Sequence, residues 1–214
     1  MKIARLFAVA CALAASVVAA DDRPASPAAE AAANTAEAVG ALLHALRPHC
    51  GKAFAGRVLV DEPASPTSPF AGKSLVMHMR ECRDDGIRIP LHVGDDRSRT
   101  WVLDTARGLR LKHDHRHADG SPDKVTMYGG DLDAATVTLE PTARSRLEFP
   151  VDAESVAMFR TNGLAASTTS TWAIEWAGDR FVYELSRPNG RLFRLEFDLS
   201  RPVETPPAPW GATP

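Results

Sequence analysis

Beyond its first twenty residues, the sequence has no long apolar run. A membrane-spanning helix needs about 20 consecutive apolar residues, and no stretch after Ala20 comes near that length. Residues 1–20 place basic Lys2 and Arg5 before a short apolar run that ends in small residues just ahead of Asp21. This arrangement is typical of a secretory signal peptide. We therefore predict an exported protein, periplasmic or extracellular, without a transmembrane segment.

Cysteine is scarce, with three residues in the chain. Cys11 belongs to the predicted signal peptide, which leaves Cys50 and Cys82. Two cysteines in an exported chain favour a disulfide bridge between them. They form neither a Cys-x-x-Cys redox pair nor a zinc-finger spacing, so their predicted role is structural.

The chain also lacks an excess of charge of either sign. It carries 25 basic and 27 acidic residues, and removing Lys2 and Arg5 with the signal peptide leaves 23 against 27, a net charge of −4. Nucleic-acid binding depends on lysine and arginine neutralising phosphates, and here the arginines are interleaved with Asp and Glu. A nucleic-acid partner is therefore not expected.

Signatures of common enzymes are missing as well. The chain contains no Gly-x-Ser-x-Gly nucleophile elbow, no phosphate-binding loop and no His-Glu-x-x-His zinc motif. The sequence thus identifies no catalytic residue and no cofactor.

From Lys52 onward the sequence alternates apolar and polar residues with a period of two. Ile87, Ile89, Leu91 and Val93, for example, occupy every second position of one run. One buried and one wet face is typical of antiparallel sheet, and the short turns between runs leave no room for the crossovers that parallel strands need. The predicted strands cover residues 54–60, 74–82, 86–93, 99–104, 109–117, 124–129, 135–140, 144–149, 171–176, 180–185 and 191–199.

About ten half-buried strands in succession predict an all-β fold, an antiparallel up-and-down meander. Laid flat, such a sheet exposes two edges, and closing it into a barrel removes them. We therefore predict a closed barrel whose interior is filled by side chains or holds one small ligand. A β-sandwich is the alternative. The barrel and its N-terminal helix are predicted to form a single domain over residues 36–200.

Two short helices and two irregular segments complete the prediction. Residues 21–35 lack large apolar side chains, which predicts a disordered linker. Apolar residues at helical spacing predict an amphipathic helix over 36–47. A second helix over 152–163 begins with Asp152 as N-cap, and we expect it to lie over one mouth of the barrel. The last fourteen residues, 201–214, contain five prolines and are predicted to form a flexible tail.

With a signal peptide, an N-terminal helix and then about ten short strands, the chain resembles the calycin barrels, the group of lipocalins and fatty-acid-binding proteins. The resemblance covers roughly residues 51–199 and rests on architecture. Lipocalins carry Gly-x-Trp at the first strand, whereas this chain has Gly51-Lys52-Ala53 followed by Phe54. The chain is also similar to uncharacterised exported bacterial proteins. The calycin resemblance implies a small apolar or amphiphilic ligand inside the barrel, and it carries over no functional residue.

One predicted hairpin, over residues 108–130, places three histidines on one face. His113, His115 and His117 share their parity with the leucines that precede them, so their side chains point to the inner side of the strand. Residues two apart on a strand are about 6.6 Å apart at Cα. His113 and His115 can therefore share one metal ion, whereas His117 falls toward the rim.

A metal site would need a third ligand from another strand. His78 and His92 are candidate donors, but both have the polar parity of their strands. No Glu follows the His-x-His pair within a few residues, as it does in cupins. We therefore treat a metal site on His113 and His115 as the alternative to a role in hydrogen bonding.

The predicted interior combines these histidines with apolar side chains. Met127, Trp172 and Tyr183 are expected to face inward with His113 and His115, which makes an apolar box with one polar corner. We expect these five residues to bind a small, partly apolar ligand, with a histidine gaining charge to attract an anionic head group. Two alternatives remain: a metal-dependent or histidine-assisted enzyme in the same interior, and a filled barrel that acts through its surface as an envelope interaction module.

Overall fold

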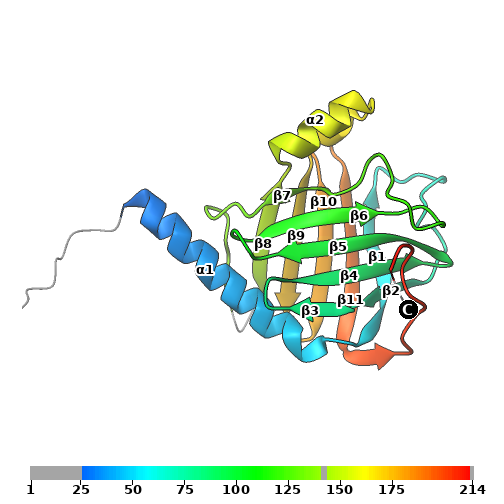
Figure 1. Ribbon diagram of the computed structural model, residues 1–214, viewed down its shortest axis with the longest axis horizontal. Coiled ribbons are helices and arrows are strands. Elements are labelled where there is room, and N and C mark those ends of the chain that lie inside the picture. The colour runs from blue at the N-terminus through cyan, green and yellow to red at the C-terminus, as the bar shows by residue number, and fades with distance from the viewer. Residues whose placement is uncertain (1–25, 141–143, 213–214) are drawn as a thin grey trace, which may run out of the picture.

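The computed structural model describes residues 26–140 and 144–212. In that part of the chain, eleven strands form one antiparallel sheet (Figure 1). The helices are α1 (Pro27–Leu46), the 3-10 helix η1 (Arg47–His49), α2 (Ala153–Thr161) and the 3-10 helix η2 (Ala165–Thr169). The strands are β1 (Ala53–Glu62), β2 (Leu75–His78), β3 (Glu81–Arg83), β4 (Gly86–Val93), β5 (Asp96–Asp104), β6 (Arg110–His115), β7 (Tyr128–Asp131), β8 (Ser145–Pro150), β9 (Thr171–Ala177), β10 (Arg180–Ser186) and β11 (Leu192–Val203).

Most strands pair with their neighbours along the chain. The order across the sheet is β7-β6-β5-β4-β2-β1-β11-β10-β9-β8, with β3 paired to β4. β1 pairs with β2 and also with the last strand, β11, and β2 pairs with β4. In Figure 1, β4, β5 and β6 run across the view in front of β8 to β11, so the sheet curls round until its two edges meet. The predicted antiparallel meander is therefore confirmed.

The two edges of the sheet, β7 and β8, meet at a short seam. A single antiparallel bridge joins Gly130 to Val151, and Asp152 N donates to Gly129 O at 2.9 Å. The backbones approach so closely there that a Cβ on Gly130 would lie 1.8 Å from Pro150 O. The barrel is thus nearly closed, because these few contacts replace a full ladder of hydrogen bonds.

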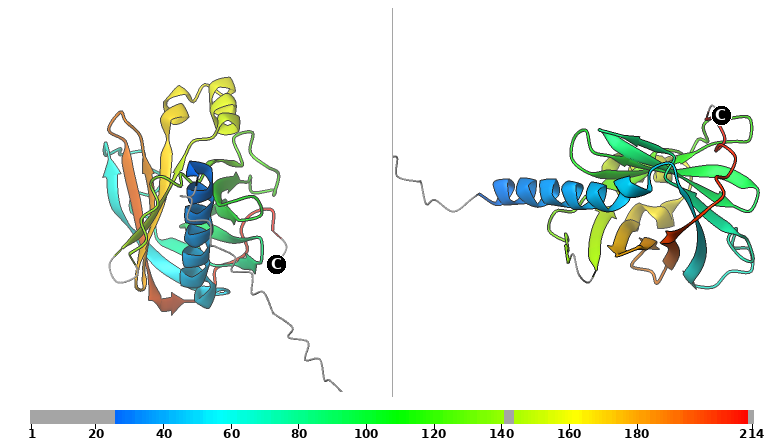
Figure 2. Two further views of the ribbon diagram at one scale, coloured as in Figure 1. Left: turned by 90° about the vertical axis from the view of Figure 1, so that its left-hand side faces the viewer. Right: turned by 90° about the horizontal axis from the view of Figure 1, so that it is seen from below.

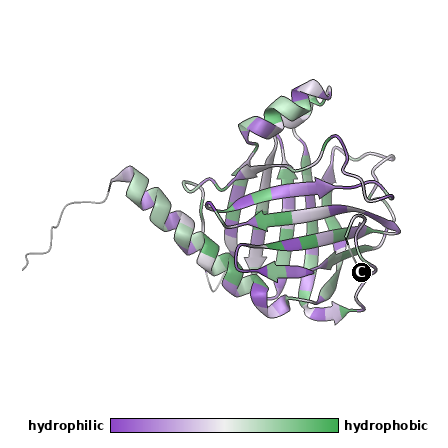
Figure 3. Ribbon diagram, in the orientation of Figure 1, coloured by the Kyte–Doolittle hydropathy of each residue, from purple (hydrophilic) through white to green (hydrophobic). Residues whose placement is uncertain are grey.

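Apolar side chains from both layers fill much of the interior. Hydrophobic and hydrophilic residues alternate along the strands (Figure 3), as expected for a sheet with one buried face. Phe149, Phe181 and Phe197 are at most 1 % exposed. Gly56 on β1 leaves the space for Phe197, since a Cβ there would lie 2.3 Å from the ring. The core is therefore continuous across the two layers.

A disulfide joins Cys50 to Cys82, as the sequence predicts. It links the segment after η1 to β3, with Cα atoms 6.1 Å apart. Closing a loop of this size typically contributes about 2 to 4 kcal/mol to stability. The bridge ties the end of the N-terminal helix to the sheet.

Helix α1 is longer than the sequence predicts. It begins at Pro27, with the Ser26 side chain accepting from Ala29 N, rather than at residue 36. The alanines of this segment have the highest helix propensity of any residue, which outweighs their lack of large apolar side chains. The C-terminal half packs Ala38, Leu42 and Leu46 into the core, and the first half projects from the barrel (Figure 2).

Several predicted strands differ in extent. The run over 74–82 is two strands, β2 and β3, separated at Met79 and Arg80. Residues 135–140 form no strand and contribute one bridge, between Thr138 and Arg146. The hairpin strand predicted over 124–129 begins instead at Tyr128. Local alternation indicates which segments can extend, but pairing with a neighbour decides where each strand ends.

The C-terminal segment lies against the outside of the barrel. Trp210 N donates to Arg97 O at 3.1 Å, and Arg97 Nη1 donates to Ala208 O at 3.2 Å. Pro209 is buried in this contact. Ala208 and Trp210, predicted to belong to a flexible tail, are therefore bonded to β5. The predicted signal peptide, residues 1–20, lies outside the described residues.

Within residues 26–140 and 144–212, none of the helices combines the length and the apolar character that a membrane span requires.

Candidate functional site

A cavity of about 320 Å³ lies inside the barrel, at the end where α2 and η2 cross it. Phe159 of α2 and Leu164 of the following turn contribute to its wall. The helix therefore lies over the cavity, where the sequence-based prediction places it. Asp152 is its N-cap, as predicted, and accepts from Ser155 N at 2.8 Å.

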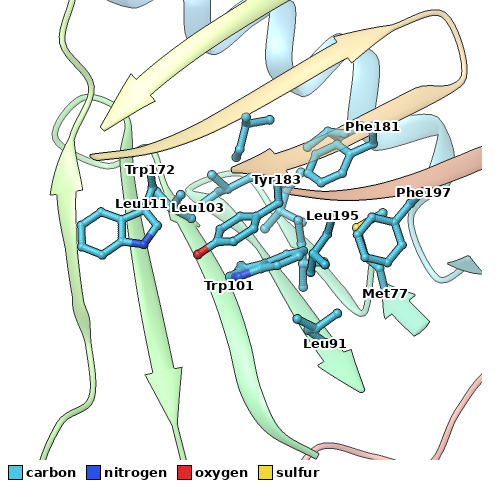
Figure 4. Packing of buried hydrophobic residues seen from close by; sticks show 14 of the residues in the cluster. Met77, Leu91, Trp101, Leu103, Leu111, Trp172, Phe181, Tyr183, Leu195 and Phe197 are labelled. Atoms are coloured by element: carbon cyan, nitrogen blue, oxygen red, sulfur yellow. The ribbon is translucent and has the colours of Figure 1, made fainter. Parts of the chain in front are cut away.

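Aromatic rings form the floor of the cavity. Trp101 of β5 and Tyr183 of β10 stack with ring centres 4.3 Å apart and planes inclined by 18°. Figure 4 shows this pair facing Trp172 on one side, with Phe181 and Phe197 on the other. The two phenylalanines are buried and do not line the cavity. The Trp101–Tyr183 stack thus separates the open part of the interior from the filled part.

His113 lies in the wall beside this floor, and both of its ring nitrogens have partners. Nδ1 is 3.2 Å from Tyr128 O, and Nε2 is 2.8 Å from the Tyr183 hydroxyl. A carbonyl can only accept, so Nδ1 carries the proton and Nε2 accepts from Tyr183. Its ring also stacks on that of Tyr128, with centres 4.8 Å apart. His113 is therefore held in one neutral tautomer.

Burial sets the charge state of these groups. It lowers the pKa of His113 to about 3, because the protonated ring would lose its hydration. The same cause raises the pKa of Tyr128 to about 12 and that of Tyr183 well above its ordinary value. At neutral pH the imidazole and both phenols are therefore uncharged, and the interior network is held together by neutral hydrogen bonds.

His115 lies nearer the mouth and is partly exposed. Its Nε2 is 3.1 Å from the Tyr128 hydroxyl. Burial, followed by the positive charge of Arg99, lowers its pKa. His117 is exposed and lies outside the cavity wall. Alternation along the strand therefore predicted correctly that His113 and His115 face the interior.

Among the described residues, none joins the histidine pair as a third metal ligand. No group of three or more His, Cys, Asp or Glu side chains suited to a metal ion occurs within the residues described. His78 and His92, the candidate donors, lie on strands β2 and β4 and do not line the cavity. Both are 4 % exposed, and burial lowers the pKa of His92 to about 4.

Four of the five residues predicted to bind a ligand line the cavity, namely His113, His115, Trp172 and Tyr183. Met127 does not: its side chain is 39 % exposed. Its backbone has φ 55°, in the left-handed region, and this turn changes the parity of the residues that follow. Tyr128 stands directly opposite His113 and therefore shares its inner face.

The sequence-based prediction missed three arginines at the mouth of the cavity. Arg99, Arg187 and Arg191 line the cavity together with Asp123. Arg187 and Arg191 flank the turn Pro188-Asn189-Gly190, where charged residues ordinarily mark a solvated loop. No local pattern distinguishes an arginine that turns inward at such a position.

The mouth arginines have different partners. Arg99 pairs with Asp96 and lies over the Phe70 ring at 5.6 Å. Arg191 Nη1 is 2.6 Å from Asp61 Oδ1. The cavity therefore presents a neutral aromatic floor and a mouth rich in guanidinium groups.

Comparison of the chain with protein-family models, with curated proteins and with solved structures finds no match.

Proposed function

We propose that the protein binds a small, partly apolar ligand inside its barrel. The observation that carries this proposal is the 320 Å³ cavity with an aromatic floor and polar groups at its mouth. Cavities of about 300 to 1,000 Å³, mostly apolar and with a few convergent polar groups, are the usual sites of small ligands. The neutral His113–Tyr183 pair adds hydrogen-bonding groups without burying a charge.

The fold and the compartment agree with this proposal. A nearly closed antiparallel barrel is compatible with a calycin-like architecture, and by analogy with the calycins it can hold a ligand in its interior. The disulfide between Cys50 and Cys82 suits an oxidising compartment. Together with the expected signal peptide, it supports a role in the periplasm or outside the cell.

The alternatives predict other properties. A histidine-assisted enzyme needs an imidazole whose pKa lies near the working pH, whereas burial lowers the pKa of His113 to about 3. A protein that acts only through its surface does not need a cavity inside the barrel, whereas this barrel has one of about 320 Å³. A mass spectrum of the native purified protein, followed by extraction, discriminates among these readings because it detects a bound organic ligand or metal directly.

The binding site itself is tested with a neutral, environment-sensitive dye such as Nile red. Val125 lines the cavity, and Val125→Trp should fill it and weaken dye binding at least tenfold. Val203 is 39 % exposed on β11 and does not line the cavity. Val203→Trp is therefore the matched control and should bind as the unmodified protein does. Equal binding by both variants would place the dye elsewhere and contradict the proposal.

A further inference from the structure

Arg187 differs from the other two arginines at the cavity mouth. Its Nε donates to Ser170 Oγ and its Nη2 to Ser167 Oγ, each at 3.0 Å. Within residues 26–140 and 144–212, no carboxylate lies within ion-pair distance of its guanidinium, whereas Arg99 and Arg191 each have one. Arg187 is thus a cation without a counter-ion among the described residues.

Asp123, the acidic residue of the cavity wall, does not pair with Arg187. Asp123 accepts from Val125 N at 2.7 Å, and its other oxygen is 3.9 Å from His117 Nε2. Its carboxylate is therefore directed toward its own loop.

The environment of Arg187 favours an anion. The side chain is half-buried at the end of β10, and burial, followed by the charge of Arg191, lowers its pKa. A partly desolvated cation is unfavourable unless it is paired. Its Nη1 has no hydrogen-bond partner in the described part of the chain. A guanidinium edge of this kind matches the geometry of a carboxylate or phosphate.

Two hydroxyl groups complete this site. Ser167 and Ser170 accept from Arg187 and keep their own protons. Each hydroxyl can therefore donate to an oxyanion placed beside the guanidinium. The histidines offer no competing charge, because burial keeps His113 and His115 neutral at physiological pH.

We propose that the ligand is an amphiphile whose oxyanion binds Arg187, Ser167 and Ser170 at the mouth, with its apolar part reaching inward to Trp101 and Tyr183. This inference rests on the proposed function and deepens it. It also moves the anion site from the histidines, where the sequence places it, to the arginine.

The test compares three ligands of equal length, decanoate, decanol and decylamine, by calorimetric titration of the purified protein. A hydrogen-bonded charge pair predicts that decanoate binds about ten- to a hundredfold more tightly than decanol, and decylamine more weakly than both. High salt should weaken decanoate binding and leave decanol binding unchanged. This salt comparison needs no variant and so is independent of folding defects.

Variants assign the effect to Arg187. Arg187→Gln should weaken decanoate about tenfold or more and leave decanol unchanged, and Arg187→Lys should restore part of the preference. Arg57 is the matched control: its side chain is 72 % exposed, and it pairs with Glu196 on the outer face. Arg57→Gln should retain the full preference for decanoate.

The two proposals fail in different ways. Equal binding of decanoate and decanol to the unmodified protein, or an equal loss of both in Arg187→Gln, would overturn the anion site and leave apolar binding intact. Absence of binding by all three ligands and by Nile red would overturn the proposed function and this inference with it.

The direction of the ligand is tested by tryptophan quenching. In a Trp172→Phe background, Trp101 is the tryptophan that lines the cavity. Decanoate brominated at its far end should quench Trp101 more strongly than decanoate brominated beside the carboxylate. The reverse order would place the head group at the floor and contradict the proposed orientation.

Discussion

The Tyr183 hydroxyl donates to His113, which is 4 % exposed, so little solvent is available to take its place. Tyr183→Phe keeps the stack on Trp101 but leaves His113 Nε2 unpaired. An unsatisfied buried acceptor costs about 1 to 3 kcal/mol, and we expect that loss in the free energy of unfolding measured with urea. Tyr128→Phe is the control. It should cost less, because its partner His115 is partly exposed and can turn to water. Equal losses of unfolding free energy in the two variants would show that burial does not strengthen the hydrogen bond between Tyr183 and His113.

The lowered pKa of His113 also predicts a dependence of stability on pH. The unfolded chain protonates this histidine near 6.5, whereas the folded chain does so near about 3. Protonation thus favours unfolding between these values: the stabilisation is complete above pH 6.5 and is lost as pH falls toward 3. His113→Gln keeps a donor and an acceptor but does not titrate. The unmodified protein should lose up to about 1.4 kcal/mol per pH unit relative to His113→Gln in this window. Parallel pH profiles for the two proteins would contradict the assignment.

At the scale of elements, one carboxylate holds α2 against the barrel. Asp152 caps the helix and also lies 2.5 Å from Lys112 Nζ, whose residue is 5 % exposed on β6. Asp152→Asn preserves the cap but removes the charge. We expect a loss of about 2 kcal/mol or more in unfolding free energy, because a buried cation loses its nearest partner and keeps only Glu154, which is 3.7 Å away with its side chain 74 % exposed. Asp152→Ala should lose about 1 kcal/mol further, the usual value of an N-cap.

A double-mutant cycle checks this explanation. In a Lys112→Met background no buried cation remains, so Asp152→Asn should become nearly neutral. The same loss in both backgrounds would mean that the charge of Asp152 does not act through Lys112.

For the whole molecule, the stability of the barrel depends on the seam between β7 and β8. Gly130→Ala would place a methyl group 1.8 Å from Pro150 O, so the two edges must separate. We expect a loss of at least about 2 kcal/mol and faster hydrogen exchange of the Asp152 amide. Gly40→Ala, in an open position of α1 with no atom within 4 Å of the added carbon, should stabilise the protein by up to about 1 kcal/mol. A seam variant as stable as this control would show that the edges are not tightly joined.

The sequence alone determined the features that depend on near neighbours. Alternation with a period of two identified most strands, and parity placed His113 and His115 on the inner face. Asp152 was recognisable as a helix cap, and the count of cysteines identified the bridge from Cys50 to Cys82. These predictions hold because side-chain direction within a strand, and capping within one helical turn, depend on residues only a few positions apart.

Local reasoning was wrong where a single backbone irregularity intervened. The left-handed conformation of Met127 turned that residue outward and Tyr128 inward. A shift of one residue reverses the faces of everything beyond it, and no residue type at this position announces the shift.

Only the tertiary structure decided how the barrel closes and where its charge is unbalanced. The pairing of Ala53 with Val203 and the seam at Gly130 join segments that are distant along the chain. Arg187 has no counter-ion among the described residues, whereas Asp61 and Asp96, which belong to other strands, pair with Arg191 and Arg99. A pattern of neighbours specifies which face a side chain occupies. The contents of a cavity depend on which distant faces are brought together, and that is settled by the packing of the whole chain.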